Sequence, residues 1–312
     1  MNIYDFIFIT NIPAFYKVNL FNRLAKHCRI KVIFIAKKSK IRNNDFYNYH
    51  HEFAREYINT GNFEDRDKLK TLIKVYKSIK NSRFTKLIYP GWEIKELFVK
   101  RMSSAYPSEI LQKKILEKIK FKGKITLTHG VGIPNYIKQP FKYSYEKKEN
   151  LTLTYLYVGR LSEEKNLSFL VEIFNERQEK LIIIGDGPEA YNLKRKAKSN
   201  ISFLGYINNK DLKQIYKSVD VFILPSKSEP WGLVIEEALT FGLPVIVSNK
   251  VGCKDDLVFK KNGLIFDINN NSFRICLDDM NKNYKKYFEH VNTLDMKLIY
   301  EKQVESYLIS LE

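Results

Sequence analysis

The sequence predicts an α/β protein in which two doubly wound parallel sheets follow one another along the chain. Short apolar segments alternate with stretches of helical periodicity through most of the 312 residues, which is typical of parallel strands joined by helices. In the second half these apolar segments are nearly continuous, as expected for strands covered on both faces. The length also accommodates two domains of roughly 150 residues each.

The first half contains the weaker pattern. Amphipathic spacing predicts helices over 18–27, 67–80 and 108–119. The polar residues 38–64 are predicted to form a long loop, and the charged, turn-rich residues 138–150 are the best linker candidate. The first domain is therefore predicted at residues 1–140. Its strands are predicted at Tyr4–Ile9, Lys31–Ile35, Lys86–Tyr89 and Lys124–Thr128.

The second half repeats the alternation more regularly, and a second domain is predicted at residues 141–290. Helical spacing over 284–310 predicts that residues 291–312 form a C-terminal helix packing back towards the first domain. Two doubly wound domains bind ligands at the carboxyl ends of their strands. Strands are predicted at Leu153–Val158, Lys180–Ile184, Ser202–Leu204, Val221–Leu224 and Pro244–Val247, and helices at 167–177, 188–198, 209–217 and 232–241.

Positive charge is concentrated in the first half. Residues 1–148 contain 31 Lys and Arg against 12 Asp and Glu, whereas residues 149–312 contain 22 against 23. A compositional bias would act on both halves alike, so the difference favours an anionic membrane surface or an anionic acceptor. A merely solvated face and nucleic acid are the weaker alternatives, since no recognition helix or single-strand motif supports the latter.

Three widely spaced cysteines fit a reducing compartment. No apolar run reaches the ~20 residues of a membrane span, and the first residues read as a buried strand rather than a leader. These features predict a cytoplasmic protein.

Two carboxylates flank a predicted helix start after the strand at 221–224. Glu229 lies in the turn, Gly232 opens the helix, and Glu237 follows within it. Free backbone N–H groups at a helix start suit a phosphate or a sugar hydroxyl, and the two carboxylates are suited to hydroxyls at two ends of one extended ligand. From these residues alone, a capping role for Glu229 and a solvated position for Glu237 remain open.

The segment SEPWGLVIEEALTFGLPVIVS, residues 228–248, resembles the E-x7-E signature of glycosyltransferase family 4. VGRLSEEKN (158–166), GDGPE (185–189) and FLGYINNKDL (203–212) are similar to further blocks of that family, in the same order. The resemblance implies a GT-B architecture, with two Rossmann-like domains facing across a cleft. It also implies a retaining, metal-independent transferase that needs no cofactor and takes its sugar from a nucleotide-diphosphate sugar.

The resemblance assigns roles to individual residues. It implies that Arg160 and Lys165 neutralise the diphosphate and that Glu229 holds the donor sugar, which makes these three the candidate catalytic residues. Glu237 would hold the ribose hydroxyls. The other candidate donor-binding residues are Gly187, Tyr206, Ile207, Pro230, Trp231, Gly232 and Leu233.

The first half resembles the family less. The resemblance there is carried by three segments, NIPAFYKVNLF (11–21), GWEIKEL (91–97) and KITLTHGVGIPN (124–135). No glycine precedes Gly61, so the glycine-rich loop that many members carry after their first strand is absent. The candidate acceptor-side residues, for which core or surface packing is the alternative, are Asn11, Tyr16, Lys17 and His129.

No metal site is expected. The single D-x-D pair, Asp65 and Asp67, stands at a predicted helix start, where capping is the expected role. The five histidines show no ligand spacing.

The sequence thus predicts a hexose-type glycosyltransferase acting on a glycan or lipid-linked acceptor, in cell-surface polysaccharide or lipopolysaccharide synthesis. Its expected partners are the nucleotide-sugar donor, that acceptor and an anionic membrane, with no nucleic acid. We expect it to be peripheral on the inner face of the cytoplasmic membrane. The alternatives are a GT-B sugar-nucleotide epimerase and a non-catalytic sugar-nucleotide-binding protein.

Overall fold

The computed structural model describes residues 3–47, 49–88, 104–106, 113–114, 117–118, 120, 123–134, 152–259 and 261–311. The chain divides into two units. Unit 1 comprises Met1–Ser108, Gln112–Asn135 and Ile299–Glu312, and unit 2 comprises Glu109–Leu111 and Tyr136–Leu298. Three segments singled out in the sequence lie outside the described residues. They are most of the helix predicted over 108–119, the GWEIKEL segment (91–97) and the linker predicted over 138–150.

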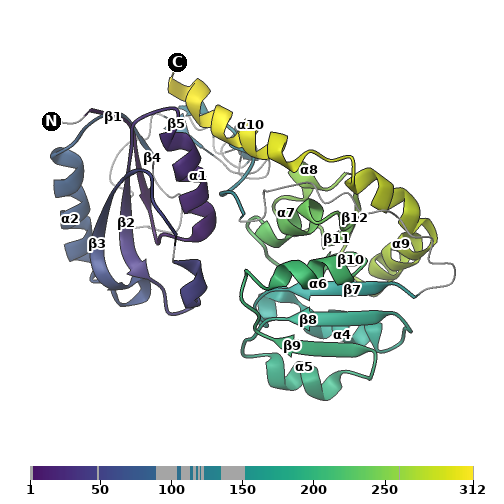
Figure 1. The fold of residues 1–312 in the computed structure, drawn as a ribbon. Coiled ribbons are helices and arrows are strands. Elements are labelled where there is room, and N and C mark those ends of the chain that lie inside the picture. The colour runs from purple at the N-terminus through teal and green to yellow at the C-terminus, as the bar shows by residue number, and fades with distance from the viewer. Residues whose placement is uncertain are drawn as a thin grey trace. The chain divides into compact units, whose positions relative to one another are not determined.

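Unit 1 is built on a four-stranded parallel sheet with the order β3-β2-β1-β4. Helix α2 covers one face of this sheet and α1 the other (Figure 1). A separate parallel pair joins β5 to β6. The strands are β1 (Ile3–Thr10), β2 (Ile30–Lys38), β3 (Ala54–Asn62), β4 (Arg83–Ile88), β5 (Ser104–Ala105) and β6 (Lys124–Ile125), and the helices are α1 (Phe15–Ala25), α2 (Lys68–Lys80) and the 3-10 turns η1 (Asn44–Phe46) and η2 (Phe63–Asp65).

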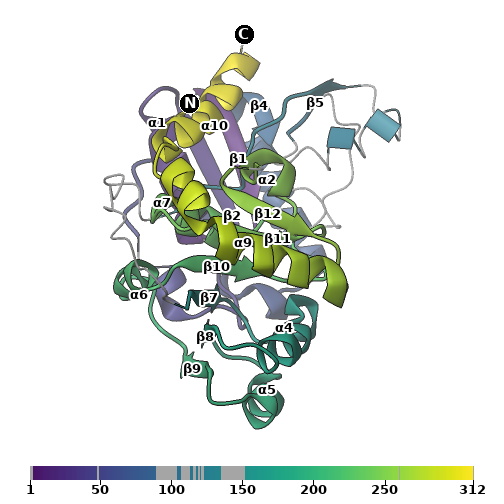
Figure 2. The same ribbon diagram turned by 90° about the vertical axis from the view of Figure 1, so that its right-hand side faces the viewer.

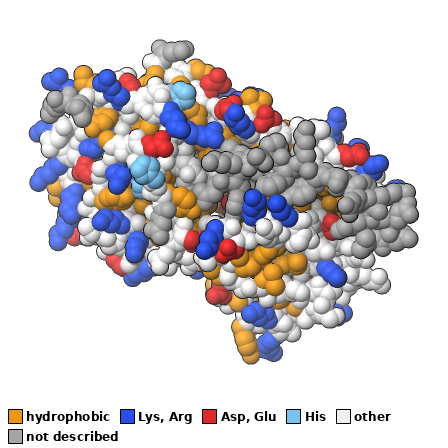
Figure 3. Space-filling model, viewed as in Figure 1, with side chains coloured by type: hydrophobic (Ala, Val, Ile, Leu, Met, Phe, Trp, Pro, Cys, Tyr) orange, Lys and Arg blue, Asp and Glu red, His pale blue; other side chains and the backbone are white. Residues whose placement is uncertain are grey.

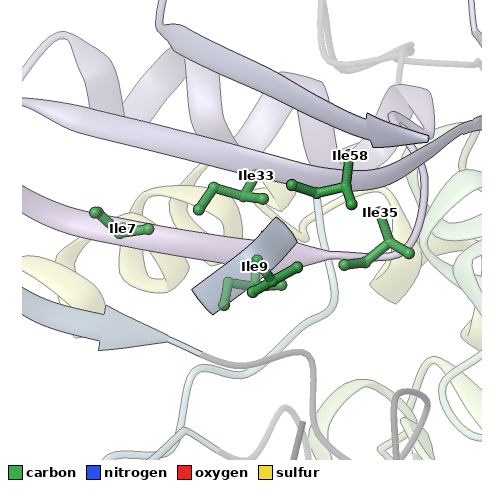
Figure 4. Packing of buried hydrophobic residues seen from close by; sticks show 6 residues of the cluster. Ile7, Ile9, Ile33, Ile35 and Ile58 are labelled. Atoms are coloured by element: carbon green, nitrogen blue, oxygen red, sulfur yellow. The ribbon is translucent and has the colours of Figure 1, made fainter. Parts of the chain in front are cut away.

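Successive side chains of a strand point to opposite faces of its sheet, and both faces of β1 are buried. On one face Phe8 packs against Phe21 of α1, with ring centroids 4.8 Å apart. On the other face Val75 of α2 joins an aliphatic cluster (Figure 4). The isoleucines of that cluster are Ile7, Ile9, Ile33, Ile35 and Ile58.

The prediction of a loop over 38–64 was wrong, because β3 occupies Ala54–Asn62. This strand lies at the edge of the sheet and buries only Ile58 fully. An edge strand needs little apolar surface and commonly carries charged residues. Its sequence, AREYINTGN, therefore lacks the apolar run by which the other strands were predicted.

The helical spacing over 284–310 covers parts of two helices, because α9 (Asn270–Val291) ends before α10 (Met296–Leu308) begins, and α10 lies within the predicted residues 291–312. The side chains of Asn292 and Thr293 hydrogen-bond to the carbonyls of Phe288 and His290, at 2.7 and 2.8 Å. Such local bonds compete with helix continuation.

The end of the chain packs within unit 1. The ring of Tyr307 in α10 lies 5.6 Å from that of Phe8 and 5.8 Å from that of Tyr106. The hydroxyl of Tyr106 also donates to Ser310 Oγ at 3.1 Å. Ile299–Glu312 thus completes the α1 side of the first sheet.

Unit 2 holds a six-stranded parallel sheet with the order β12-β11-β10-β7-β8-β9 (Figure 2). The prediction of two parallel, doubly wound sheets is confirmed. The strands are β7 (Thr154–Val158), β8 (Lys180–Ile184), β9 (Ile201–Gly205), β10 (Val221–Leu224), β11 (Val245–Ser248) and β12 (Gly263–Phe266). The helices are η5 (Glu163–Lys165), α4 (Leu167–Phe174), α5 (Ala190–Lys196), α6 (Leu212–Ser218), α7 (Leu233–Thr240), α8 (Lys254–Leu257) and α9.

The D-x-D pair has structural partners. Asp67 caps α2 by accepting a hydrogen bond from the backbone N–H of Lys70 at 2.9 Å, which confirms its predicted role. Asp65 forms an ion pair with Lys40 at 2.5 Å. Among the described residues, no three His, Cys, Asp or Glu side chains gather closely enough to hold a metal ion. No helix within those residues has the length and apolar character needed to cross a membrane.

Candidate functional site

The candidate donor-binding residues lie along one edge of the second sheet. Its strands are all parallel, so their carboxyl ends meet at a single edge. Glu229 follows β10, Arg160 follows β7, Gly187 follows β8, and the 43% exposed Tyr206 follows β9 together with the half-buried Ile207. These four strands are neighbours, and at a strand spacing of about 4.8 Å the row spans about 14 Å. The candidate residues therefore form a row along this edge and not a single cluster.

Two oppositely charged side chains of the candidate site, Lys165 and Glu229, meet where the strand order reverses. Strands β7 and β10 pair side by side, with β8 and β9 on one side and β11 and β12 on the other. In doubly wound sheets this reversal is where ligands bind. Lys165 Nζ forms an ion pair with the Glu229 carboxylate across the reversal, and the two side chains are 18% and 15% exposed.

The two loops that carry this ion pair are fixed to each other by their backbones. Asn166 adopts a left-handed conformation, with φ of 59°, and its amide donates to the Pro225 carbonyl at 3.2 Å. The N–H of Lys227 donates to the Glu164 carbonyl at 2.8 Å. The loop after β7 and the loop after β10 are therefore positioned as one piece.

Glu229 does not cap the helix that follows it. Its backbone forms a parallel bridge with Val251, and its carbonyl accepts from the N–H of Gly252 at 2.8 Å. Helix α7 begins at Leu233, and its cap residue Gly232, with φ of 101°, makes no side-chain capping bond. The cap position of α7 is held by Gly232 and not by Glu229, so the capping alternative for Glu229 is wrong.

Arg160 is exposed, and a side chain of the preceding strand fixes the turn that carries it. The hydroxyl of Tyr157, in β7, donates to the Arg160 carbonyl at 2.9 Å. Burial raises the pKa of the Tyr157 hydroxyl well above its ordinary value, so it remains a donor. Sequence reasoning missed this residue, although a tyrosine inside a continuously buried strand requires a partner for its hydroxyl.

Gly187 is required by backbone packing. A Cβ at this position would lie 2.4 Å from the Leu161 carbonyl oxygen. The N–H of Leu161 donates to the Asp186 carbonyl at 2.9 Å, which ties the loop after β8 to the loop after β7. Only a residue without a side chain allows the two loops to come this close.

The Pro230–Leu233 segment divides into an exposed and a buried part. Pro230 is exposed and Leu233 is half-buried, whereas Trp231 is buried. The indole N–H of Trp231 donates to the Glu236 carboxylate inside unit 2. The Trp231 side chain is thus structural, and the backbone N–H groups of residues 231–233 are the parts of this segment suited to a ligand. Sequence reasoning missed Glu236.

Glu237 is buried in α7, so its solvated alternative is wrong. The hydroxyl of Tyr216, in α6, donates to Glu237 Oε2 at 3.1 Å, and the Tyr216 ring stacks on Phe241 at 4.9 Å. Burial raises the pKa of the Glu237 carboxyl from 4.5 to about 7, and the bond from Tyr216 opposes that rise. A burial of this kind is characteristic of functional carboxyls.

The raised pKa of Glu237 predicts a pH-dependent stability. Because the folded state holds this proton more tightly, ionisation of Glu237 destabilises the fold as pH rises from 4.5 to about 7. The free energy of unfolding of Glu237→Gln, relative to that of the wild type, should therefore rise by on the order of 3 kcal/mol across this pH window. Urea unfolding at pH 5, 6, 7 and 8 measures the difference. The exposed Glu172 of α4 provides a control, and a Glu237→Gln profile parallel to that of Glu172→Gln would contradict the assignment.

Three of the acceptor-side candidates meet at the end of β1. Lys17 Nζ donates to Thr10 Oγ1 and to Asn11 Oδ1, both at 2.8 Å. The Tyr16 carbonyl accepts from the N–H of Ile133 at 2.8 Å, which joins it to the THGVGIP segment. In that segment His129 is exposed and has a left-handed φ of 50°.

Comparison with known proteins identifies the second unit. Residues 138–276 match the family model described as glycosyl transferases group 1. The matched stretch lies within the second unit and is similar to this family. This finding confirms the resemblance to glycosyltransferase family 4, whose signature blocks all lie within the matched residues.

Curated relatives match about a third of the chain. An uncharacterized glycosyltransferase of Methanocaldococcus jannaschii is 35% identical over 118 residues, covering 35% of this chain and 30% of that protein. A GDP-mannose-dependent alpha-mannosyltransferase of Corynebacterium glutamicum is 34% identical over 112 residues, covering 36% and 27%. The aligned part of the chain therefore spans less than a third of the length of either relative.

The solved structures extend the likeness to the whole chain. The apo form of the lipopolysaccharide outer core galactosyltransferase WaaB superposes with a TM-score of 0.70 at 14% identity, covering 99% of this chain and 100% of that one. The chain thus has the GT-B fold, as the resemblance implied.

Proposed function

We propose that this protein transfers a hexose from a nucleotide-diphosphate sugar to a glycan or lipid-linked acceptor, with retention of the donor's anomeric configuration. The observation that carries the proposal is the Lys165–Glu229 ion pair at the reversal of strand order in the second sheet. The Lys165 ammonium, which can bind a phosphate, lies beside the Glu229 carboxylate, which can accept hydrogen bonds from sugar hydroxyls.

Each part of the donor has a matching group along the edge. The guanidinium of Arg160 and the ammonium of Lys165 hold the diphosphate, and the N-terminal amides of α7 support it. Glu229 takes the hydroxyls of the sugar, and Glu237 those of the ribose. Tyr206 and Ile207 meet the base, while Gly187 lets the loop after β8 approach the donor closely.

Charge stabilisation of the leaving diphosphate is the main catalytic contribution of these residues. In the structure Glu229 forms an ion pair with Lys165 and neutralises its charge. When the donor binds, the ammonium turns to the diphosphate and the carboxylate to the sugar. Negative charge that develops as the glycosidic bond breaks is then met by Arg160 and Lys165. The departing diphosphate accepts the proton of the attacking hydroxyl on the same face of the sugar, and no metal is required.

The donor class is supported by a relative. The mannosyltransferase of Corynebacterium glutamicum depends, by its name, on GDP-mannose, which is a nucleotide-diphosphate sugar. The acceptor rests on charge alone. The excess of Lys and Arg in residues 1–148 favours an anionic acceptor at a membrane, as in the assembly of a cell-surface polysaccharide or lipopolysaccharide on the inner face of the cytoplasmic membrane.

A thermal-shift screen across nucleosides, nucleoside diphosphates and their sugars tests the donor. One nucleoside diphosphate and its sugar should raise the melting temperature by a few degrees, because ligand that binds only the folded state stabilises it in proportion to RT ln(1 + [L]/Kd). The corresponding nucleoside should have a smaller effect. No shift with any nucleotide would contradict the proposal. Isomerised sugar without acceptor would identify an epimerase, and binding without transfer to any glycan or lipid would identify a binding protein.

A further inference from the structure

Helix α2 exposes large apolar side chains on its outer face. Its buried residues Thr71, Val75 and Ser78 pack towards the first sheet. By contrast Leu69 is 68% exposed, Ile73 48% and Tyr76 64%. A surface helix normally turns polar residues away from the core, so this outer face requires a different explanation.

The three exposed residues form one ridge. At about 100° of rotation per residue, positions 69, 73 and 76 fall within an arc of about 60°. The buried positions 71, 75 and 78 fall within a similar arc on the opposite side. The ridge therefore points straight away from the sheet and runs along a helix about 20 Å long.

Lysines border the ridge. The sequence of α2, KLKTLIKVYKSIK, contains five lysines and no acidic residue. Lys70, Lys74 and Lys77 lie along one flank, Lys68 lies on the other, and Lys80 continues the ridge at its end. Figure 3 shows blue Lys and Arg side chains crowding the edge of the molecule at which Figure 1 places α2.

We propose that this ridge, Leu69–Ile73–Tyr76, and its flanking lysines dock unit 1 onto an anionic lipid bilayer. The inference rests on the membrane partner of the proposed function and names the surface that contacts it. An apolar ridge between cationic flanks is the pattern of helices that lie in a membrane interface, where apolar side chains enter the acyl boundary and lysines meet the headgroups. Nucleic acid would satisfy the lysines but leave the three apolar side chains in water.

Vesicle co-sedimentation with the full chain tests the docking surface. Vesicles of phosphatidylglycerol and phosphatidylcholine should retain the protein, and vesicles of phosphatidylcholine alone should not. Ile73→Ser/Tyr76→Ser should weaken retention on the anionic vesicles at least about tenfold. The matched control is Ile275→Ser/Tyr191→Ser in unit 2, where the same residue types are 59% and 71% exposed, and it should bind as the wild type does.

A second pair of variants tests the charges. Lys70→Gln/Lys77→Gln should weaken retention roughly fivefold for each lysine, whereas Lys194→Gln/Lys196→Gln on α5 should have little effect. All these side chains are exposed, so folding is checked by unchanged melting temperatures and by an unchanged thermal shift with the nucleoside diphosphate.

The inference would be overturned by ridge variants that bind anionic vesicles like their control, or by lysine variants that lose binding while the ridge variants keep it. The second result would indicate a purely electrostatic surface, such as one for nucleic acid. If the wild type is not retained by anionic vesicles but its melting temperature rises with a nucleotide, the docking surface is refuted and the donor site is supported. If it is retained by the vesicles but no nucleotide raises its melting temperature, the donor site is refuted and the docking surface is supported.

Discussion

Arg160→Ala is expected to lower the turnover number by about 100- to 1000-fold, the usual cost of removing one group that stabilises transition-state charge. Arg160 is exposed, and its turn is held through its backbone by Tyr157, so the variant should fold normally. Turnover is measured as release of nucleoside diphosphate from the donor that the thermal-shift screen selects. Arg160→Lys should recover only part of the loss, because an ammonium cannot form the forked contact of a guanidinium.

The matched control is Arg195→Ala. Arg195 is also exposed and lies over the Tyr191 ring at 5.7 Å, on α5. Its removal should leave turnover within about twofold, since it lies outside the strand edge that carries the donor site. Turnover of Arg160→Ala equal to that of this control would remove Arg160 from the diphosphate site.

Gly185→Ala is expected to destabilise unit 2 by about 3 kcal/mol or more. A Cβ at Gly185 would lie 1.8 Å from the Gly159 carbonyl oxygen, and the φ of Gly185 is 134°. The three nearest atoms are all backbone atoms of Gly159, and Gly159 is fixed by the bond from its N–H to the Ile184 carbonyl at 3.0 Å. The overlap therefore has no side chain that can move aside. Urea unfolding gives the change in free energy.

Substitutions at two other glycines separate the two sources of destabilisation, which are steric overlap and backbone conformation. Gly205 has a left-handed φ of 70° with open space around it, and Gly61 has open space without that conformation. Gly205→Ala should cost about 1–2 kcal/mol from conformation alone, and Gly61→Ala should change stability by at most about 0.5 kcal/mol. If Gly185→Ala were no worse than Gly205→Ala, the close approach of the loops after β7 and β8 would be disproved.

The second unit was the more predictable half. Its strands are continuous apolar runs, so β8 and β10 were predicted at their observed bounds. β12, with four residues of which Leu264 and Ile265 are not buried, was not predicted. In the first unit, β3 escaped prediction because an edge strand with one buried residue has no apolar run.

The candidate site was predictable as residue types and not as contacts. The positions of Arg160, Lys165 and Glu229 after strand ends follow from the sequence, but the ion pair across the strand reversal depends on which strands are neighbours. The bond from Tyr216 to Glu237 likewise joins two helices whose packing no local pattern specifies. Trp231 was assigned to the donor site through the family resemblance, and no local pattern indicated that its indole N–H donates to Glu236.

The central claim is that the Lys165–Glu229 pair marks a diphosphate site. Titration calorimetry tests it by comparing the affinities of a nucleoside diphosphate and its nucleoside for the wild type and for Lys165→Met, which removes the charge and keeps most of the side chain. We predict that the preference for the diphosphate falls at least about tenfold in the variant, with the affinity for the nucleoside unchanged. An undiminished preference for the diphosphate in Lys165→Met would contradict the account.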